Sequence, residues 1–362
     1  MEEENLKIKT IVIVTFFVLS LTIGLAPVHV DGIDLGNEVV IWNTTNYPGD
    51  TSDHTRCEVL FAKGYYWLYF DWVPEGGGNP DIYMMKSRNA ADWSSPQAVV
   101  SGPDNEQDPR VLFYGGTFHL TFLIGDVLYI QTSTDGEHFG GQRVLYDTPG
   151  GLSYNKLVNH DGSFYLGYED LASRDIYVAK SQDLYNWEDP VVAGQTPQVD
   201  FVPDLCVGQG RIWVVWNYFA DGRSHLMIVS SEDGVTWTEG TEIPTGSDVT
   251  WVFGPYSLIW DKGKFIFVTR MAPSEVLPVN LRHWRMMMAI SSDGYTWSPF
   301  EQVSEPQDVD YYWEKGGTIF PLTVGRNSGY AYSVVFKRTI YDSVEDQLEY
   351  ERSELCQVLL NI

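Results

Sequence analysis

Residues 230–237 read SSEDGVTW, and residues 290–297 repeat the pattern as ISSDGYTW. Aligning this pattern with the whole chain gives five copies of a serine, an Asp or Asn two residues later, and an aromatic residue four further on. The copies are Ser87–Trp93, Ser133–Phe139, Ser181–Trp187, Ser231–Trp237 and Ser291–Trp297. Their aromatic residues lie 46, 48, 50 and 60 residues apart. Five copies at near-constant spacing predict a repeat architecture.

Each copy lies between two apolar segments that have the character of strands, such as IYVAKS before Asp183 and DPVVAG after it. The Asp or Asn side chain can accept hydrogen bonds from backbone N–H groups across a tight turn, and Gly supplies a positive φ. The following aromatic residue can pack between neighbouring sheets. We therefore expect a structural hairpin turn and assign no chemistry to it.

A second hairpin precedes each copy, for example RVLFYGGTFHLTFLI at 110–124, so each unit of about fifty residues holds four antiparallel strands. A sixth unit, residues 318–360, has a hairpin and a third strand but lacks the Ser-Asp-Trp turn. The strand EVVIWN at 38–43 could supply its outer edge and close the ring, which would remove the free edge that an open sheet exposes. The pattern predicts an all-β propeller of four-stranded antiparallel blades. Six blades are expected, closed by the N-terminal strand in the last blade, with five as the alternative.

Composition narrows the partners and excludes some chemistries. The chain of 362 residues has a formal net charge of −26, which argues against nucleic acid. Its three cysteines are too few for a disulfide framework, and the sequence contains no CxxC or HExxH pattern. We expect no metal and no cofactor.

The N-terminus carries the one strongly apolar stretch, residues 10–26, preceded by Lys7 and Lys9. This length and charge pattern indicate a signal peptide or a short membrane anchor. The sequence thus divides into a signal or anchor segment, 1–32, and a single propeller domain, 33–362. A secreted or cell-surface protein is expected, with possible membrane attachment through residues 10–26.

The Ser-x-Asp-Gly-x-Thr-Trp copies resemble the Asp boxes, or BNR repeats, of sialidases and related propellers. The copy SQDLYNWEDP at 181–190 is similar to the corresponding turn of the five-bladed arabinanase- and fructosidase-like glycosidases. The segment Gln107–Arg110 resembles their Arg-Asp-Pro segment, with Gln in place of Arg. The resemblance implies a ligand at one mouth of the central channel, lined by the starts of the first strands and by the loops between second and third strands.

The residues placed at that mouth suit glycoside hydrolysis. A pair of carboxyl groups can cleave a glycosidic bond, and the guanidinium group of arginine can bind a carboxylate through two hydrogen bonds. The candidate catalytic residues are Asp53, Asp108, Glu169, Glu314 and Tyr311. The candidate substrate-binding residues are Arg56, Arg174, Arg270, Arg282, Arg285, Trp313 and Tyr218.

The family resemblance assigns these residues in two ways. A sialidase would use Arg56, Arg270 and either Arg282 or Arg285 as its arginine triad, with Tyr311 or Tyr312 beside Glu314. An arabinanase-like enzyme would draw its carboxylates from Asp53, Asp108 and Glu169.

Two functions follow as hypotheses. The first is an exported, exo-acting and sialidase-like glycoside hydrolase with a carboxylate pair and an arginine cluster at the channel mouth. The second is a non-catalytic surface propeller that binds a glycan or a protein.

Overall fold

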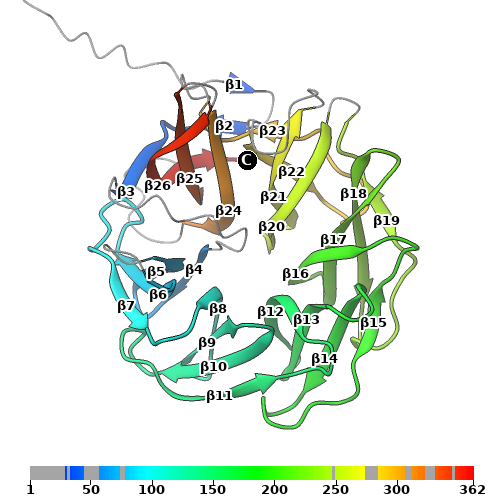
Figure 1. Ribbon diagram of the computed structural model, residues 1–362. Helices are drawn as coiled ribbons and strands as arrows, with labels where there is room; N and C mark the ends of the chain where they lie inside the picture. Colours follow the sequence, from blue (N-terminus) through cyan, green and yellow to red (C-terminus); the bar gives the residue numbers. More distant parts are fainter. Residues whose placement is uncertain are drawn as a thin grey trace, which may run out of the picture.

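Six β-sheets surround a common axis in the computed structural model (Figure 1). The structure describes residues 29–30, 33–44, 57–73, 78–246, 249–273, 284–305, 311–322, 331–344 and 347–362, and these contain strands and turns without an α-helix. The predicted all-β propeller with six blades is confirmed.

The first three blades follow one another along the chain, and in each the first strand lies nearest the axis. Blade 1 contains β4 (Cys57–Ala62), β5 (Tyr65–Trp72), β6 (Asp81–Ser87) and β7 (Gln97–Val100). Blade 2 contains β8 (Glu106–Tyr114), β9 (Thr117–Ile124), β10 (Val127–Ser133) and β11 (Gly140–Tyr146). Blade 3 contains β12 (Leu152–His160), β13 (Ser163–Asp170), β14 (Ile176–Ser181) and β15 (Val191–Gly194).

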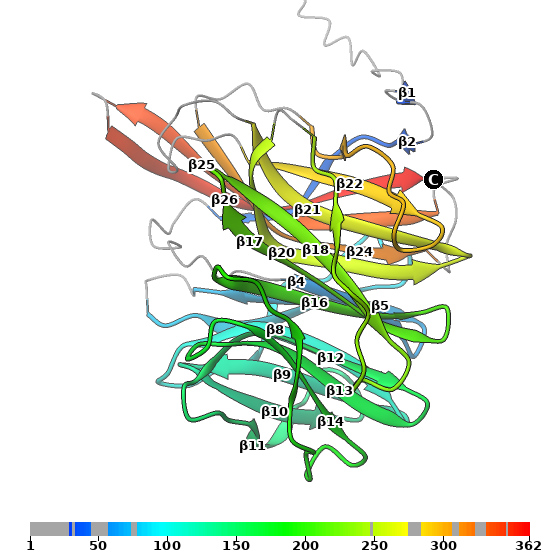
Figure 2. The ribbon, with the colours of Figure 1, turned by 90° about the vertical axis from the view of Figure 1, so that its right-hand side faces the viewer.

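The remaining blades continue the ring, and Figure 2 shows their strands from the side. Blade 4 contains β16 (Asp200–Gly208), β17 (Arg211–Ala220), β18 (Arg223–Ser231) and β19 (Thr241–Ile243). Blade 5 contains β20 (Val249–Asp261), β21 (Lys264–Pro273), β22 (Arg285–Ser291) and β23 (Glu301–Gln302). Blade 6 contains β24 (Tyr311–Pro321), β25 (Tyr332–Val344), β26 (Gln347–Asn361) and β3 (Val39–Thr44), extended by β2 (Ile33–Leu35) and β1 (His29–Val30).

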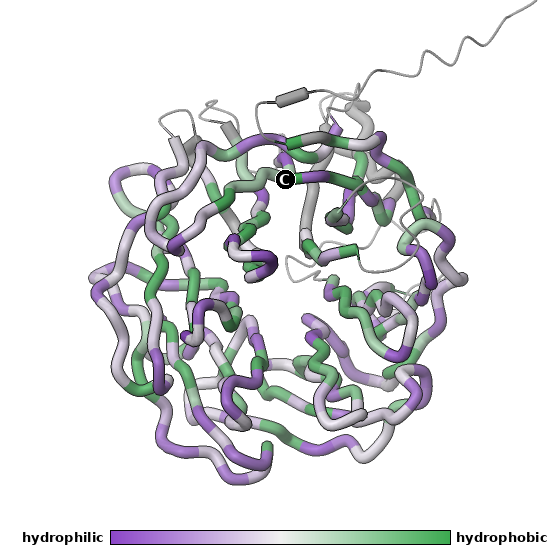
Figure 3. The backbone as a smooth tube through the Cα atoms, turned by 180° about the vertical axis from the view of Figure 1, so that it is seen from behind, coloured by the Kyte–Doolittle hydropathy of each residue, from purple (hydrophilic) through white to green (hydrophobic). Residues whose placement is uncertain are grey.

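The hydrophobic core lies in the layers between neighbouring blades. The second strand of a blade is covered on both faces, so a strand such as β5 reads YYWLYFDW and is buried almost throughout. Between blades 4 and 5, the rings of Trp213 and Phe265 are buried with their centroids 4.7 Å apart. Figure 3 shows hydrophobic segments running within the blades and hydrophilic stretches at many of the outer turns.

The five repeated turns, four with Asp and one with Asn89, share one hydrogen-bond pattern. In the turn of blade 4, Ser231 Oγ donates to Asp233 Oδ1 at 3.0 Å, and the same oxygen accepts the N–H groups of Val235 and Thr236 at 2.8 Å. Equivalent bonds recur in the other four turns. Because the backbone donors of Thr236 and Val235 stabilise the ionised carboxylate, the pKa of Asp233 falls to about 2.

Glycine in these turns permits close contact with the preceding blade. Gly294 has a φ of 81°, and a Cβ added there would lie 2.4 Å from the ring of Trp213 in blade 4. Gly234 meets Tyr165 of blade 3 in the same way, with 2.3 Å to the nearest ring atom. In blades 4 and 5 the turn therefore fixes the blade against the one before it as well as closing a hairpin.

The ring is closed in blade 6, as the sequence predicts. Strand β3 pairs antiparallel with β26, with Trp42 opposite Leu355. Just before β3, both carboxylate oxygens of Glu38 bind the buried Arg338, one of them at 2.8 Å. The backbone N–H of Glu38 also donates to Glu305, whose N–H donates back to Glu38 at 2.9 Å. The N-terminal segment is thus tied to both blades 5 and 6.

Two short strands extend this closure beyond what the sequence indicates. Strand β2 pairs with the end of β26, where Leu35 lies opposite Leu360, and Ile33 is buried in the layer between blades 5 and 6. Strand β1 pairs with β2, although it lies within the predicted signal or anchor segment, 1–32. Residues 10–26 lie outside the described part of the chain, and no described helix has the length and hydropathy to cross a bilayer.

Replacing Gly294 with alanine tests the contact between turn and blade. The substitution combines the strain of a positive φ with a collision against Trp213, so we expect a loss of about 3 kcal/mol in the free energy of unfolding. Gly222→Ala is the matched control, because Gly222 has a φ of 80° with no atom within 4 Å, and it should lose only about 1 kcal/mol. Urea unfolding of both variants measures the difference, and equal losses would contradict the packing role.

Removing the carboxylate of Glu38 tests the ring closure. In Glu38→Gln the buried guanidinium of Arg338 loses its two-oxygen partner, and we expect the free energy of unfolding to fall by about 3 kcal/mol. Glu239→Gln removes an exposed acid and should change stability by less than about 0.5 kcal/mol. If Glu38→Gln is as stable as that control, the contact between Glu38 and Arg338 does not keep the ring of blades closed.

Candidate active site at the channel mouth

The first strands of blades 1 to 4 place four charged side chains at equivalent positions around the axis: Glu58, Arg110, Lys156 and Asp204. Arg110 binds Glu58 and also lies 3.4 Å from Asp204 Oδ1. Lys156 Nζ lies 2.5 Å from Glu58 Oε1. Burial opposes ionisation of Glu58, but Lys156 and Arg110 outweigh it and hold its pKa below the usual value. This charge-balanced network links four blades across the channel.

Above this network, towards the mouth, the first strands of blades 2, 3 and 4 carry a bulge at the same place. The bulge residues Asp108, Tyr154 and Val202 have φ values of 57°, 47° and 56°. A carboxylate from the preceding blade accepts the bulge N–H in two of the three cases: Asp71 Oδ2 from Asp108 at 3.3 Å, and Glu169 Oε2 from Val202 at 3.4 Å. These two acids therefore each stabilise the first strand of the next blade, β8 or β16.

One cavity at the mouth combines a carboxylate, an arginine and aromatic rings. We call it the mouth pocket; it measures about 390 Å³ and is lined by Asp126, Ser153, Tyr154, Glu169, Leu171, Arg174, Val199 and Phe201. Glu169 is 1% exposed; its Oε1 lies 3.1 Å from the guanidinium of Arg174, and Ser153 Oγ donates to its Oε2 at 3.2 Å. The structure thus brings the predicted residues Glu169 and Arg174 together.

The turn between β13 and β14 directs Arg174 over this carboxylate. Asp170 Oδ2 accepts the N–H of Ser173 at 2.8 Å, and the carbonyl of Asp170 accepts the N–H of Arg174 at 2.8 Å. Arg174 itself has a φ of 64°, a conformation that non-glycine residues seldom adopt. The short loop therefore holds Arg174 back against its own blade, half-exposed above Glu169.

Sequence reasoning did not select Asp126, although this exposed acid lines the mouth pocket with Glu169. Asp126 lies in the two-residue turn between β9 and β10, which is the loop between the second and third strands of blade 2. Loops of that class supplied candidates from other blades, so the same rule applied to blade 2 would have found it.

A second pair of acids missed by the sequence analysis lies between blades 1 and 2. Asp81 accepts the backbone N–H of Gly102, and Glu106 Oε1 lies 2.8 Å from the position that a Cβ on Gly102 would occupy. Glu106 is 3% exposed, and its Oε2 has no hydrogen-bond partner among the described residues. Burial, together with the charge of Asp81, raises the pKa of Glu106 to about 7.

The other predicted residues occupy separate places. Asp108 is fully buried, and its carbonyl accepts a hydrogen bond from Asn155 at 3.3 Å. Tyr218 stacks on His225, with ring centroids 4.8 Å apart. Arg270 lies 4.9 Å over the ring of Trp284.

Arg270 and Arg285 are not brought together. Arg270 pairs with Met286 across β21 and β22, whereas Arg285 pairs with Met271, so the two arginines project from opposite faces of blade 5. Asp53, Arg56 and Arg282 lie outside the described residues. Tyr311, Trp313 and Glu314 lie on β24, whose backbone pairs with β25, and their side chains are outside the described part. The roles of all these residues stay predictions.

The donor set at the mouth suits proton transfer and ion pairing. No group of three or more His, Cys, Asp or Glu residues that could hold a metal ion occurs in the described part of the chain. The mouth pocket offers two carboxyl groups, one guanidinium and two aromatic rings, which are the groups that recognise and cleave sugars.

Comparisons with known proteins agree with this fold. No protein-family model and no curated protein sequence matches the chain. Among solved structures, the NanB sialidase from Streptococcus pneumoniae aligns with a TM-score of 0.62 at 13% identity, over 89% of this chain and 70% of that one. A mutant Trypanosoma rangeli sialidase with trans-sialidase activity aligns at 0.53 and 11% identity, over 90% of this chain and 58% of that one.

A second group of solved structures is also similar. The catalytic domain of a GH62 α-L-arabinofuranosidase from Coprinopsis cinerea aligns with a TM-score of 0.51 at 10% identity, over 69% of this chain and 94% of that one. At these identities the likeness shows a shared propeller fold. The structural neighbours thus include members of both groups that the sequence motifs resemble.

The acid pair between blades 1 and 2 predicts a pH dependence of stability. Because the pKa of Glu106 rises from 4.5 to about 7 on folding, the native state holds a proton between these values that the unfolded chain releases. Stability should therefore fall as the pH rises through this window. Glu106→Gln keeps a neutral group of the same shape at every pH. The stability of this variant minus that of the wild type should therefore be larger at pH 8 than at pH 5, by about 1–2 kcal/mol after screening by nearby solvent.

Urea unfolding of both proteins at pH 5 and pH 8 measures this gain. Glu239→Gln, which changes an exposed acid, should run parallel to the wild type. If Glu106→Gln also runs parallel, Glu106 is ionised in the native state at both pH values and the assignment fails.

Proposed function

We propose that this protein is an exo-acting glycoside hydrolase whose substrate enters the mouth pocket, with Glu169 as one of its two essential carboxyl groups. The observation that carries the proposal is the convergence of Glu169, Arg174 and Asp126 on one cavity beside Tyr154 and Phe201. A cavity of about 390 Å³ is near the lower end of ligand-pocket sizes and suits one terminal sugar unit. The solved glycosidases with this fold support the same class.

The two acids have different surroundings and hence different roles in this proposal. Glu169 is buried against a guanidinium, which binds the ionised form and suits a nucleophile or a base. Asp126 lies at the exposed edge of the cavity and is the candidate partner acid; the buried Asp108 is the alternative. Arg174, half-exposed, can bind Glu169 and still reach a substrate oxygen.

A sialidase-like specificity is the finer part of the proposal. The substrate carboxylate of a sialoside would need cationic partners, of which Arg174 lines the mouth pocket and Arg270 lies on the second strand of blade 5. A neutral pentoside would need only the acid pair and the aromatic rings. The substrate panel below separates these two cases.

A glycan-binding propeller without catalysis is the second candidate. It is favoured by the hydrogen bonds that already engage Glu169, since Arg174, Ser153 and the N–H of Val202 occupy its oxygens in a structural arrangement. In that case the mouth pocket would hold a sugar through the same residues but would not cleave it.

A panel of chromogenic glycosides that includes a sialoside and an arabinofuranoside tests the proposal. We expect turnover of at least one member, and a loss of at least about 100-fold in Glu169→Gln and in either Asp126→Asn or Asp108→Asn. If Glu169 is the nucleophile, added azide should partly restore turnover in Glu169→Gly by taking the place of the missing carboxylate. Glu239→Gln serves as the control and should retain full activity.

Two outcomes would contradict this proposal. One is the absence of turnover across the panel while the folded wild type still binds glycans, with weaker binding in Arg174→Ala; this supports the binder. The other is turnover that survives in Glu169→Gln, which would place the chemistry elsewhere in the channel.

A further inference from the structure

A larger cavity lies away from the mouth pocket, at the junction of blades 4 and 5. We call it the junction pocket; it measures about 590 Å³ and is lined by Pro244, Thr245, Gly246, Met271, Ala272, Arg285, Met287, Trp297, Ser298, Pro299 and Phe300. It shares no lining residue with the mouth pocket, which is built from blades 2, 3 and 4. Its volume lies in the range typical of small-molecule sites.

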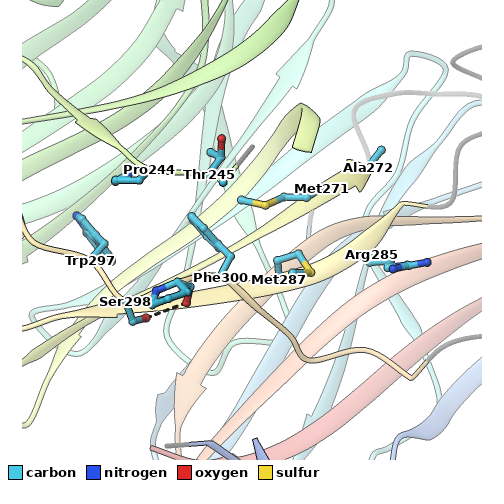
Figure 4. A pocket seen from close by; sticks show the side chains of 11 residues that line it. Pro244, Thr245, Met271, Ala272, Arg285, Met287, Trp297, Ser298 and Phe300 are labelled. Carbon is cyan, nitrogen blue, oxygen red and sulfur yellow. Dashed lines mark hydrogen bonds between the residues drawn. The ribbon is translucent and has the colours of Figure 1, made fainter. Parts of the chain in front are cut away.

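Most of the lining is apolar and firmly held. Trp297 and Phe300 each pack edge-on against Phe267, with centroid distances of 6.1 Å, so both rings are backed by the core of blade 5. Met271 and Met287 add flexible, polarisable side chains that adapt to the shape of a ligand. Figure 4 shows Phe300 and Met287 between Trp297 at one end of the pocket and Arg285 at the other.

Arg285 is the one charged residue of this lining, and it lacks a protein partner among the described residues. Its Nε is buried without a hydrogen-bond partner. Every other arginine whose side chain is described has a hydrogen bond, an ion pair or a ring contact: Arg88, Arg110, Arg143, Arg174, Arg211, Arg223, Arg270 and Arg338. The chain has 49 acids and only 23 Lys and Arg residues, so acidic partners for an arginine are abundant. A guanidinium that pairs with none of them indicates a binding site for an anion from solution.

The neighbouring Arg223 provides the contrast. It lines an adjacent hollow that also includes Pro244, Thr245 and Gly246, but its guanidinium lies 3.7 Å from Glu242. The protein neutralises this arginine itself, whereas Arg285 faces an apolar cavity. The two arginines therefore form a natural matched pair for experiment.

We propose that the junction pocket binds a small amphipathic anion, a carboxylate carried on an apolar body. The carboxylate pairs with the guanidinium of Arg285, and the apolar body lies over Met287 and Phe300 towards Trp297. Burial of the body supplies affinity in proportion to its apolar area, and the fork of Arg285 fixes its orientation. An aliphatic and an aromatic carboxylate share this chemistry. The site is independent of the proposed hydrolase and needs no residue of the mouth pocket.

Isothermal titration of the full chain with octanoate, 4-phenylbutyrate and octanol tests the proposal. We expect both carboxylates to bind at one site and octanol to bind at least ten-fold more weakly than octanoate, since it lacks the charge. A preference for octanoate would identify an aliphatic ligand, and a preference for 4-phenylbutyrate an aromatic one. Arg285→Met should lose at least ten-fold in carboxylate affinity, Arg285→Lys should lose less, and Arg223→Met should match the wild type.

Thermal unfolding of each variant shows whether it is folded, and Met287→Gln gives a second test that leaves Arg285 in place. This variant should weaken octanoate binding several-fold because it removes apolar contact from the floor of the pocket. The proposal is overturned if neither carboxylate binds at millimolar concentration, if octanol binds as tightly as octanoate, or if Arg285→Met binds like the wild type. None of these results depends on whether the mouth pocket cleaves a glycoside.

Discussion

The pairing of β3 with β26 is the constraint on which the rest of the structure depends. In blade 6 the first and last segments of the chain meet in one sheet, so β3 covers an edge that β26 would otherwise expose. Backbone pairing alone would leave this joint as weak as any edge strand. The two-oxygen contact between Glu38 and the buried Arg338, with the reciprocal bonds to Glu305, binds the segment where the joint begins. Once the ring is closed, six inner strands must converge on one axis, and their side chains share one channel.

That convergence explains how a chain of net charge −26 arranges its charges inside. The network of Glu58, Arg110, Lys156 and Asp204 contains two acids and two bases, so the excess of acids is carried elsewhere. Removing such groups from water is costly, and the pairing offsets that cost without guaranteeing net stability. What the network does provide is a tie across the channel, since each of the four blades contributes a different group, and Glu58 and Arg110 each contact two of the others.

The sequence was sufficient for the architecture because the turns repeat. Ser231, Asp233 and Gly234 bond to one another within the turn, so eight letters of sequence contain most of its hydrogen bonding. The closing strand at 38–43 was also predictable, because a sixth unit lacked one strand and an unassigned strand preceded the first unit.

The site was less predictable because it depends on register and on which face a side chain occupies. Glu169 and Arg174 lie close in sequence and meet across a short loop, whereas Arg270 and Arg285 are separated by the alternation of β21 and β22. The bulge at Asp108 shifts the register of β8, and no local sequence pattern predicts this shift. Burial decides the rest: Glu106 reads as one acid among many, and only its burial in the folded chain, with Asp81 nearby, raises its pKa.

One position in each blade shows how a symmetric fold acquires an asymmetric site. In blade 1 the axial residue Glu58 pairs with Tyr69 of the second strand, and Asp71 lies two residues further towards the mouth. The equivalent position of every second strand holds a buried side chain. In blades 1 to 6 these are Asp71, Leu123, Glu169, Asn217, Arg270 and Lys337. Asp71 and Glu169 use this position to hold a bulge, and Asn217 bonds the carbonyl of Val252. Burial lowers the pKa of Lys337 to about 7, beside the ring of Trp72. The backbone treats these positions alike, so chemistry at the mouth can change one blade at a time while the ring stays intact. Oε2 of Glu169 holds the bulge while Oε1 faces Arg174, so in the proposed hydrolase the two oxygens of one carboxylate would serve the fold and the substrate separately.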